Sequence, residues 1–264
     1  MISFAPLPTP LVPARMWERL EREHHAWIMF PDEHNEGTAN SAAKALLSPV
    51  EINRYQRYRR AQDRLLFLVA HAGVRTALSH YGDISAKDWD FSTSPQGRPE
   101  IANKDAPPGL RFNLSHTAGM AVVLVHRDKD AGVDVERLHR VKDLTSMSKM
   151  VFSPEEQADF ASCSQAEQPE RFLRYWTLKE AYTKARGMGL KLPLQEFSFE
   201  LGHSPEFFPP RISFAPGFPD SPQQWHFLTT KMSGTHFLAI ATREKKQPPG
   251  AALFFRHPLN TGFL

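Results

Sequence analysis

The sequence has 264 residues, of which 41% are hydrophobic and 23% are charged, and its 32 basic and 29 acidic side chains give a net charge of +3. This composition excludes an intrinsically disordered chain, which would have fewer apolar residues and more net charge. The longest apolar stretches, Met120–Val125 and Phe237–Ile240, are too short for a membrane span of about 20 residues. We therefore expect a soluble globular protein, no membrane partner, and either one large domain or two halves.

The N-terminal sequence and the cysteine content indicate in which cellular compartment to expect the protein. Residues 1–17 are rich in proline and contain no basic segment followed by an apolar run, so we predict an extended lead-in and no signal peptide. The single cysteine, Cys163, excludes an internal disulfide and a cysteine-rich zinc site. Both observations favour the cytoplasm.

The isoelectric point near 9.0 raises the question of a nucleic-acid partner. A net charge of +3 is a weak field over this length unless the charges cluster. They cluster once, in a run of arginines: Arg54, Arg57, Arg59, Arg60 and Arg64. This run is interpreted either as the solvated face of a helix or as a site for a phosphate-bearing ligand or an acidic protein.

The first half of the chain predicts a strand, helices and two further strands. The apolar run Ala26–Phe30 predicts the first strand. Ser48, Pro49 and Glu51 form a helix start with an N-cap, a proline at the first position and a carboxylate at the third. Helical spacing of apolar residues follows up to Leu78, as two helices or one broken helix. After a loop-rich stretch, 82–109, the patterns predict strands over these segments: Arg111–Ser115, Met120–His126 and Ala131–Glu136.

The second half repeats this order. Ser153-Pro154-Glu155-Glu156 echoes the helix start at Ser48, and Arg171–Arg186 predicts a strong helix that ends at Gly187. Four alternating segments predict strands: Phe197–Leu201, Ile212–Phe214, Trp225–Thr230 and His236–Thr242. We therefore predict an α+β fold of two similar halves, with boundaries at 1–127 and 128–246 and a loosely attached tail over 247–264.

An acidic pair lies on the strand Ala131–Glu136. Residues two apart on a strand face the same side, so Asp134 and Glu136 project together while Val133 and Val135 point into the core. Two adjacent carboxylates repel each other unless a cation lies between them, and hard oxygen ligands suit Mg²⁺. The alternative is a solvent-facing strand edge with two ordinary acids.

A second pair, Glu180 and Lys184, lies four residues apart on one face of the predicted helix. Taken alone it is an ordinary helical ion pair. The adjacent Ser115 and His116 point to opposite faces of a strand, so a nucleophilic Ser–His relay between them is poorly supported. The sequence also contains no P-loop, GxGxxG, HExxH or GxSxG motif. Carboxylates for Mg²⁺ and many cations, without a covalent nucleophile, point to transfer of a phosphate-linked group.

Two segments together carry a more specific signal. Gly132-Val133-Asp134 and, after 41 intervening residues, Trp176–Lys184 resemble the two-part signature of the 4′-phosphopantetheinyl transferases: G-[IV]-D followed by [FW]-[CST]-x-K-E-[AS]-x-x-K. Every specified position is filled. Other segments resemble the same family in the same order, over residues 46–243: the Ser48-led basic helix, Gly97-Arg98-Pro99, Phe112–His116 and Gly189–Leu194.

The resemblance implies the larger, monomeric, surfactin-synthetase-activating type, in which two halves are related by a pseudo-twofold axis. It implies transfer of the phosphopantetheine arm of coenzyme A to a serine of an apo acyl, peptidyl or polyketide carrier protein, with release of adenosine 3′,5′-bisphosphate. Mg²⁺, or Mn²⁺, would be held by Asp134, Glu136 and Glu180. Glu180 would also take the proton from the serine, and Lys184 would reach the pyrophosphate.

The first half would bind the rest of coenzyme A. The resemblance implies this role for Arg54, Arg98, Ser115 and His116. Two positions depart from the family's surfactin-type prototype, which has a basic residue in place of Glu51 and a threonine in place of Phe67. The prototype's contacts to the 3′-phosphate therefore cannot all be assigned to this chain.

An acidic carrier protein would dock on an apolar segment between Leu138 and Phe152, through Met147, Met150, Val151 and Phe152. Core packing is the alternative for each of these residues. Two other functions remain open for the whole chain. One is a catalytically silent module that binds coenzyme A or a carrier protein, against which the intact set of carboxylates and Lys184 argues. The other is nucleic-acid binding, which depends only on the isoelectric point and the arginine run.

Overall fold

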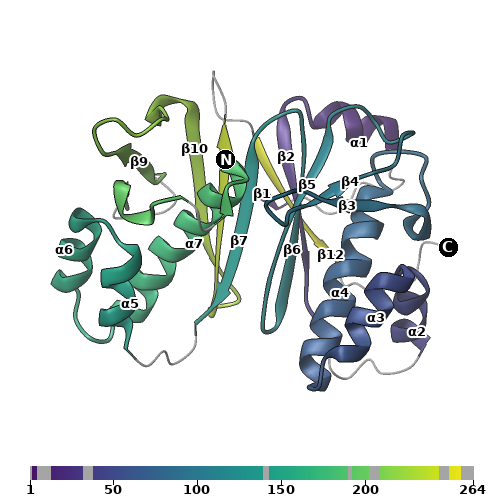
Figure 1. Cartoon of the computed structure of the whole chain (residues 1–264), viewed down its shortest axis with the longest axis horizontal. Coiled ribbons are helices and arrows are strands. Elements are labelled where there is room, and N and C mark those ends of the chain that lie inside the picture. The colour runs from purple at the N-terminus through teal and green to yellow at the C-terminus, as the bar shows by residue number, and fades with distance from the viewer. Residues whose placement is uncertain are drawn as a thin grey trace. The chain divides into compact units, whose positions relative to one another are not determined.

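The computed structural model describes residues 2–4, 13–31, 38–138, 143–189, 192–201, 209–243 and 250–256. The chain divides into two compact units, Met1–Asp128 together with Pro249–Leu264, and Lys129–Pro248. Each unit combines helices with a sheet, which confirms the predicted α+β class (Figure 1). No helix in the described ranges has both the length and the apolar character that a membrane span requires.

The first unit contains a sheet with the strand order β1-β12-β2-β6-β5. Its strands are β1 (Ile2–Phe4), β2 (Glu23–Met29), β5 (Leu110–Thr117), β6 (Met120–Arg127) and β12 (Gly250–Arg256). A separate hairpin pairs β3 (Phe91–Thr93) with β4 (Pro99–Ile101). The helices are α1 (Pro13–Arg19), α2 (Thr38–Ala45), α3 (Pro49–Arg57) and α4 (Ala61–Leu78). The apolar face of α4 packs on the sheet, where Val74 and Leu78 lie in one core with Trp27 and Val123.

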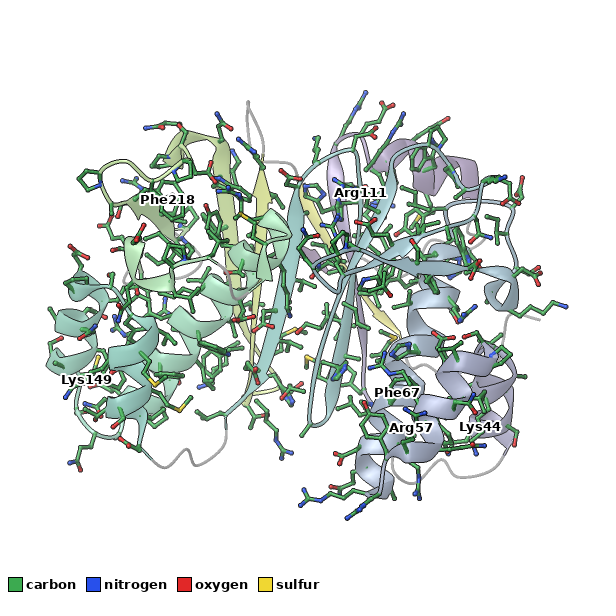
Figure 2. All side chains as sticks on the ribbon, in the orientation of Figure 1. Lys44, Arg57, Phe67, Arg111, Lys149 and Phe218 are labelled. Carbon is green, nitrogen blue, oxygen red and sulfur yellow. The ribbon has the colours of Figure 1, made fainter. Side chains whose placement is uncertain are left out.

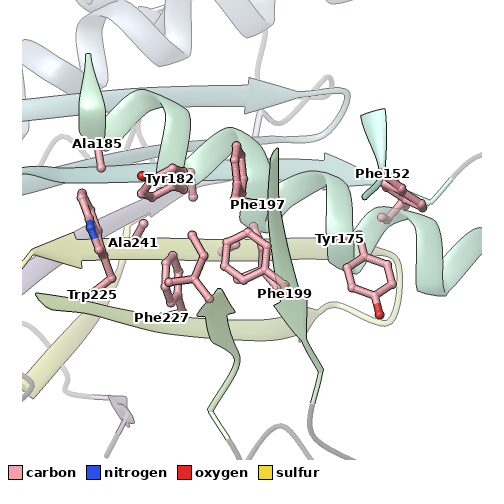
Figure 3. Packing of buried hydrophobic residues seen from close by; sticks show 14 of the residues in the cluster. Phe152, Tyr175, Tyr182, Ala185, Phe197, Phe199, Trp225, Phe227 and Ala241 are labelled. Carbon is pink, nitrogen blue, oxygen red and sulfur yellow. The ribbon is translucent and has the colours of Figure 1, made fainter. Parts of the chain in front are cut away.

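The second unit repeats this arrangement with a sheet of order β10-β11-β7. Its strands are β7 (Ala131–Arg137), β10 (Trp225–Met232) and β11 (His236–Arg243), and a small hairpin pairs β8 (Phe197–Glu200) with β9 (Arg211–Phe214). The helices are α5 (Leu144–Val151), α6 (Pro154–Ser162) and α7 (Gln168–Arg186). Aromatic rings from α7, β8 and β10 fill the core between helix and sheet, with Tyr182 in contact with Phe197, Trp225 and Phe227 (Figure 3).

Both predicted helix starts are confirmed. Ser48 caps α3 and Ser153 caps α6, and in each case the side chain of the glutamate three residues later accepts a hydrogen bond from the serine backbone. These capping boxes are local devices that satisfy the first backbone N–H groups of a helix. Residues 58–60 separate α3 from α4, which favours two helices over one broken helix.

The two ends of the chain differ from the prediction. In place of a continuous extended lead-in, the structure places β1 and α1 within residues 1–19. The predicted loose tail contains β12, which forms a parallel ladder with β2 and another with β1. This pairing joins strands more than 200 residues apart in sequence, so no local sequence pattern predicts it.

Gly132 allows α7 to lie close to β7. A Cβ atom at this position would lie 2.2 Å from the carbonyl oxygen of Ala181 and 2.5 Å from the backbone nitrogen of Ala185. Neither backbone atom can move without displacing the helix. The close packing of α7 on β7 therefore requires glycine at position 132, because any side chain there would clash with the helix backbone.

Replacing Gly132 with alanine is expected to lower the free energy of unfolding by about 1–3 kcal/mol, because one added methyl group must push α7 away from the sheet. Urea denaturation of the variant measures this loss. A variant as stable as the parent would show that α7 has room to accept a side chain at Gly132.

Candidate active site

Strand β7 and helix α7 bring Asp134 and Lys184 together. Asp134 lies on β7 and is only 4% exposed, and Lys184 lies near the end of α7. The Lys184 Nζ donates a hydrogen bond to Asp134 Oδ1 at 2.6 Å. A solvent-facing strand edge is thus excluded for Asp134, while Glu136 on the same strand is half-buried.

Glu180 lies one helical turn before Lys184 and belongs to the same electrostatic group. Burial raises the pKa of the Glu180 carboxyl, the charges of Asp134 and Glu136 raise it further, and Lys184 opposes the shift. Its Oε1 atom is buried and has no hydrogen-bond partner among the described residues. The structure therefore brings together four of the predicted site residues: Asp134, Glu136, Glu180 and Lys184.

The donor atoms of this group are of the type that a divalent cation binds, although their arrangement in this structure does not form a metal site. Carboxylate oxygens are preferred ligands of Mg²⁺. The Oε1 atom of Glu180 is buried without a hydrogen-bond donor among the described residues, and a cation would compensate its charge. Within the described ranges, no three His, Cys, Asp or Glu side chains lie in an arrangement that could hold a metal ion. In this structure the ammonium group of Lys184 supplies the positive charge beside Asp134.

The other face of α7 is fixed by a buried ion pair. Lys179 and Glu156 are both fully buried, and the Lys179 Nζ lies 2.8 Å from Glu156 Oε2. Burial raises the pKa of Glu156 and lowers that of Lys179, so each charge depends on its partner. Sequence reasoning gave the signature lysine Lys179 no role, because spacing alone does not show that a lysine is buried.

The first unit carries the predicted coenzyme A residues on three separate elements. Arg54 lies exposed on α3, Arg98 lies in the turn between β3 and β4, and Ser115 and His116 lie near the end of β5. The guanidinium of Arg54 lies over the Phe67 ring at 5.6 Å, and Arg98 donates a hydrogen bond to Glu100 at 2.9 Å. His116 is exposed and Ser115 is buried, as expected for neighbours on opposite faces of a strand.

The two positions that depart from the family's prototype lie inside the first unit. Glu51 accepts hydrogen bonds from Arg75 at 2.7 Å and 3.0 Å and lies 2.9 Å from a ring nitrogen of His71. These partners, with the capping contact at Ser48, hold the pKa of Glu51 at about 2 despite its burial. Phe67, labelled in Figure 2, is 2% exposed and packs in a small core between α2, α3 and α4. Both residues therefore have structural partners of their own.

The predicted docking segment is divided between surface and core. Met147 and Met150 on α5 are 40% and 76% exposed, whereas Phe152 is fully buried among aromatic rings. The prediction of an exposed contact is wrong for Phe152, because it anchors the end of α5 in the core. Residues 139–142 of this segment, and residues 190 and 191 of the predicted Gly189–Leu194 motif, lie outside the described residues.

Comparisons with known proteins agree with this arrangement. Residues 130–241 match the 4′-phosphopantetheinyl transferase superfamily, and residues 36–128 match the family described as "4′-phosphopantetheinyl transferase, N-terminal". The 4′-phosphopantetheinyl transferase HetI of Nostoc sp. is 32% identical, over 65% of this chain and 71% of HetI. The chain belongs to the 4′-phosphopantetheinyl transferase superfamily.

Further comparisons have lower sequence identity to this chain. The 4′-phosphopantetheinyl transferase Sfp of Bacillus subtilis is 29% identical, over 61% of this chain and 70% of Sfp. The human L-aminoadipate-semialdehyde dehydrogenase-phosphopantetheinyl transferase is 24% identical, over 75% of this chain and 67% of its own. Among solved structures, a holo-(acyl-carrier-protein) synthase from Bacillus anthracis has a TM-score of 0.37 and 18% identity, over 44% of this chain and 96% of that one.

The raised pKa of Glu180 predicts a stability cost at neutral pH. The folded protein binds the Glu180 proton more tightly than the unfolded chain does, so stability falls as the pH rises past the ordinary glutamate value of 4.5. Glu180→Gln removes this cost. We expect the variant, without added metal, to be more stable than the parent at pH 8, with a gain that shrinks toward pH 4.

Denaturation midpoints at several pH values measure this gain. Glu200→Gln, at an exposed position at the end of β8, is the matched control and should give no comparable trend. A constant difference between Glu180→Gln and the parent from pH 4 to pH 8 would contradict the assignment.

Proposed function

We propose that this phosphopantetheinyl transferase moves the 4′-phosphopantetheine arm of coenzyme A to a serine hydroxyl of an apo carrier protein, with the reaction at Asp134, Glu180 and Lys184. The serine oxygen forms a bond to the phosphorus that bears the pantetheine, and the bond from that phosphorus to the bridging oxygen breaks. The leaving group is adenosine 3′,5′-bisphosphate. The single observation that carries this proposal is the Lys184–Asp134 contact beside the half-buried Glu180, whose Oε1 atom is buried.

Glu180 is suited to take the proton of the serine hydroxyl. A carboxylate with an ordinary pKa is a weak base at neutral pH, and burial beside Asp134 raises the pKa of Glu180 toward the working range of a general base. Its buried Oε1 atom is an acceptor that no described residue satisfies. The proton leaves the serine as the oxygen attacks, so the nucleophile develops charge only in the transition state.

Lys184 is suited to bind the phosphate groups of the substrate. Its side chain is 27% exposed, so its ammonium group can contact an anion while it stays near Asp134. Positive charge beside the pyrophosphate favours departure of the leaving phosphate. Asp134 orients this ammonium group through the 2.6 Å hydrogen bond.

Asp134, Glu136 and Glu180 would hold Mg²⁺, or Mn²⁺, which binds the same oxygen ligands. When bound, the cation offsets negative charge on the pyrophosphate. Support for this assignment comes from the oxygen donors and from the electrostatics of Glu180, whose pKa is raised by burial and, to a smaller extent, by the charges of Asp134 and Glu136.

The first unit would bind the 3′-phosphate and the adenine of coenzyme A through Arg54, Arg98, Ser115 and His116. The exposure of Arg54 and His116 supports this assignment, because both can meet a ligand without a change of fold. Helix α5, with Met147, Met150 and the exposed Lys149, would contact the acidic carrier protein.

Incubation with an apo carrier protein, coenzyme A and Mg²⁺ is expected to add one phosphopantetheinyl group, which intact mass spectrometry detects. Glu180→Gln should lower the rate by about 100-fold, because an amide cannot accept the serine proton. Glu200→Gln, on the exposed end of β8, should retain the parent rate. Absence of addition on carrier proteins of both the fatty-acid and the peptide or polyketide types would overturn the enzyme assignment in favour of a binding module.

His116→Ala is expected to raise the KM for coenzyme A by about tenfold, the usual effect of one lost hydrogen bond to a charged group, and to leave kcat within a factor of about three. Dephospho-coenzyme A lacks the 3′-phosphate and serves as the control, because parent and variant should then have the same KM. An equal increase in KM for both substrates would show that His116 does not contact the 3′-phosphate.

A further inference from the structure

The ammonium group of Lys179 is saturated with hydrogen bonds inside the second unit. It donates to the carbonyl oxygens of Leu194 at 2.6 Å and Phe197 at 2.7 Å, and it lies 2.8 Å from Glu156 Oε2. It also lies over the Phe197 ring at 4.3 Å. A lysine ammonium has three donors, so these three oxygen acceptors use all of them.

Glu156, the partner of Lys179, forms hydrogen bonds with two further elements, α6 and β8. Its Oε2 atom accepts the backbone N–H of Ser153 in the capping box of α6, and its Oε1 atom accepts the backbone N–H of Phe199 on β8. The start of α6, the middle of α7 and the strand β8 therefore meet at one buried ion pair.

Stability alone does not account for a charged pair at this position. The desolvation of two fully buried charges is expensive, and apolar side chains of similar volume often stabilise a core as well or better. The best-attested use of such a pair is to fix one arrangement among several that apolar packing would allow. On α7 that arrangement includes the rotation of the helix about its axis, because Lys179 points to β8 while Ala181 and Ala185 face Gly132.

Rotation of α7 matters because the residue after Lys179 is Glu180. Successive residues of a helix are about 100° apart, so the direction of Lys179 determines the directions of Glu180 and Lys184. We propose that the Glu156–Lys179 ion pair is a positioning element, which sets the rotation of α7 and thereby aims Glu180 and Lys184 at Asp134 for the transfer reaction. This inference rests on the proposed function.

The first unit contains an equivalent pair that serves as an internal control. Arg75 on α4 bonds to Glu51, the capping-box glutamate of α3, and to the backbone carbonyl of Trp89 at 2.7 Å. The residue five positions after Arg75 is His80, which stacks on Trp27 of β2 with ring centroids 4.7 Å apart. Lys184 likewise follows Lys179 by five positions and contacts Asp134 of β7.

Strand register supports this equivalence. Trp27 pairs with Val123, the fourth residue of β6, and Asp134 pairs with Ala239, the fourth residue of β11. The same scaffold thus carries an aromatic stack in one unit and the catalytic charges in the other. The pair in the first unit has no reacting group to position.

Steady-state kinetics of Lys179→Met test the proposal, with Arg75→Met as the matched control. Methionine keeps the length of the side chain but removes its charge. We expect kcat for phosphopantetheine transfer to fall by tenfold or more, with the KM for coenzyme A within about threefold of the parent, since small displacements of reacting groups cost up to about 100-fold. Arg75→Met should lose stability and keep the parent kcat. Lys179→Arg should restore part of the lost rate, because an arginine makes the equivalent ion pair in the first unit.

A crystal structure of Lys179→Met provides a readout that is independent of activity. We expect the 2.6 Å contact between Lys184 Nζ and Asp134 Oδ1 to be lost. If Lys179→Met does not fold, Glu156→Gln tests the same pair, since glutamine keeps the shape and removes the charge. A folded variant with the parent kcat and an intact contact would overturn the positioning role alone, whereas an inactive parent would overturn the proposed function and this inference with it.

Discussion

The close approach of α7 to β7 is the constraint on which the candidate active site depends. At Gly132 the backbone of α7 lies so near that a single methyl group would meet the carbonyl oxygen of Ala181 at 2.2 Å. Because helix and strand touch there, Asp134 two residues along the strand lies within reach of Lys184 on the helix. A wider separation would leave the carboxylates of strand and helix in separate environments, without the burial and the repulsion from Asp134 that together raise the pKa of Glu180.

The two units show how one scaffold is used in two ways. Both contain a capped helix, a long helix packed on a sheet, and an ion pair between the capping glutamate and the long helix, which is partly buried in the first unit and fully buried in the second. In the first unit the turn after the long helix contacts β2 through the stack of His80 on Trp27. In the second unit the equivalent place carries the ion pair of Lys184 and Asp134.

Local patterns predicted much of this fold, whereas long-range partners did not follow from them. The Ser-Pro-x-Glu starts at Ser48 and Ser153 were predictable because a capping box involves only neighbouring residues. The strand β12 was missed because its partner β2 lies at the other end of the chain. In the site, spacing placed Glu180 and Lys184 on one face, but the burial of Asp134 and of Lys179 depends on how α7 packs on β7 and β8, which single-residue patterns do not encode.

We propose that Asp134 and Lys184 act together on the transferred phosphate. A double-mutant cycle with Asp134→Asn and Lys184→Met, measured on kcat/KM for coenzyme A in the transfer assay, measures this coupling. We expect strong coupling, in which the double variant is hardly slower than the slower single variant. Fully additive losses would contradict it, because they would mean that the two residues act in separate places.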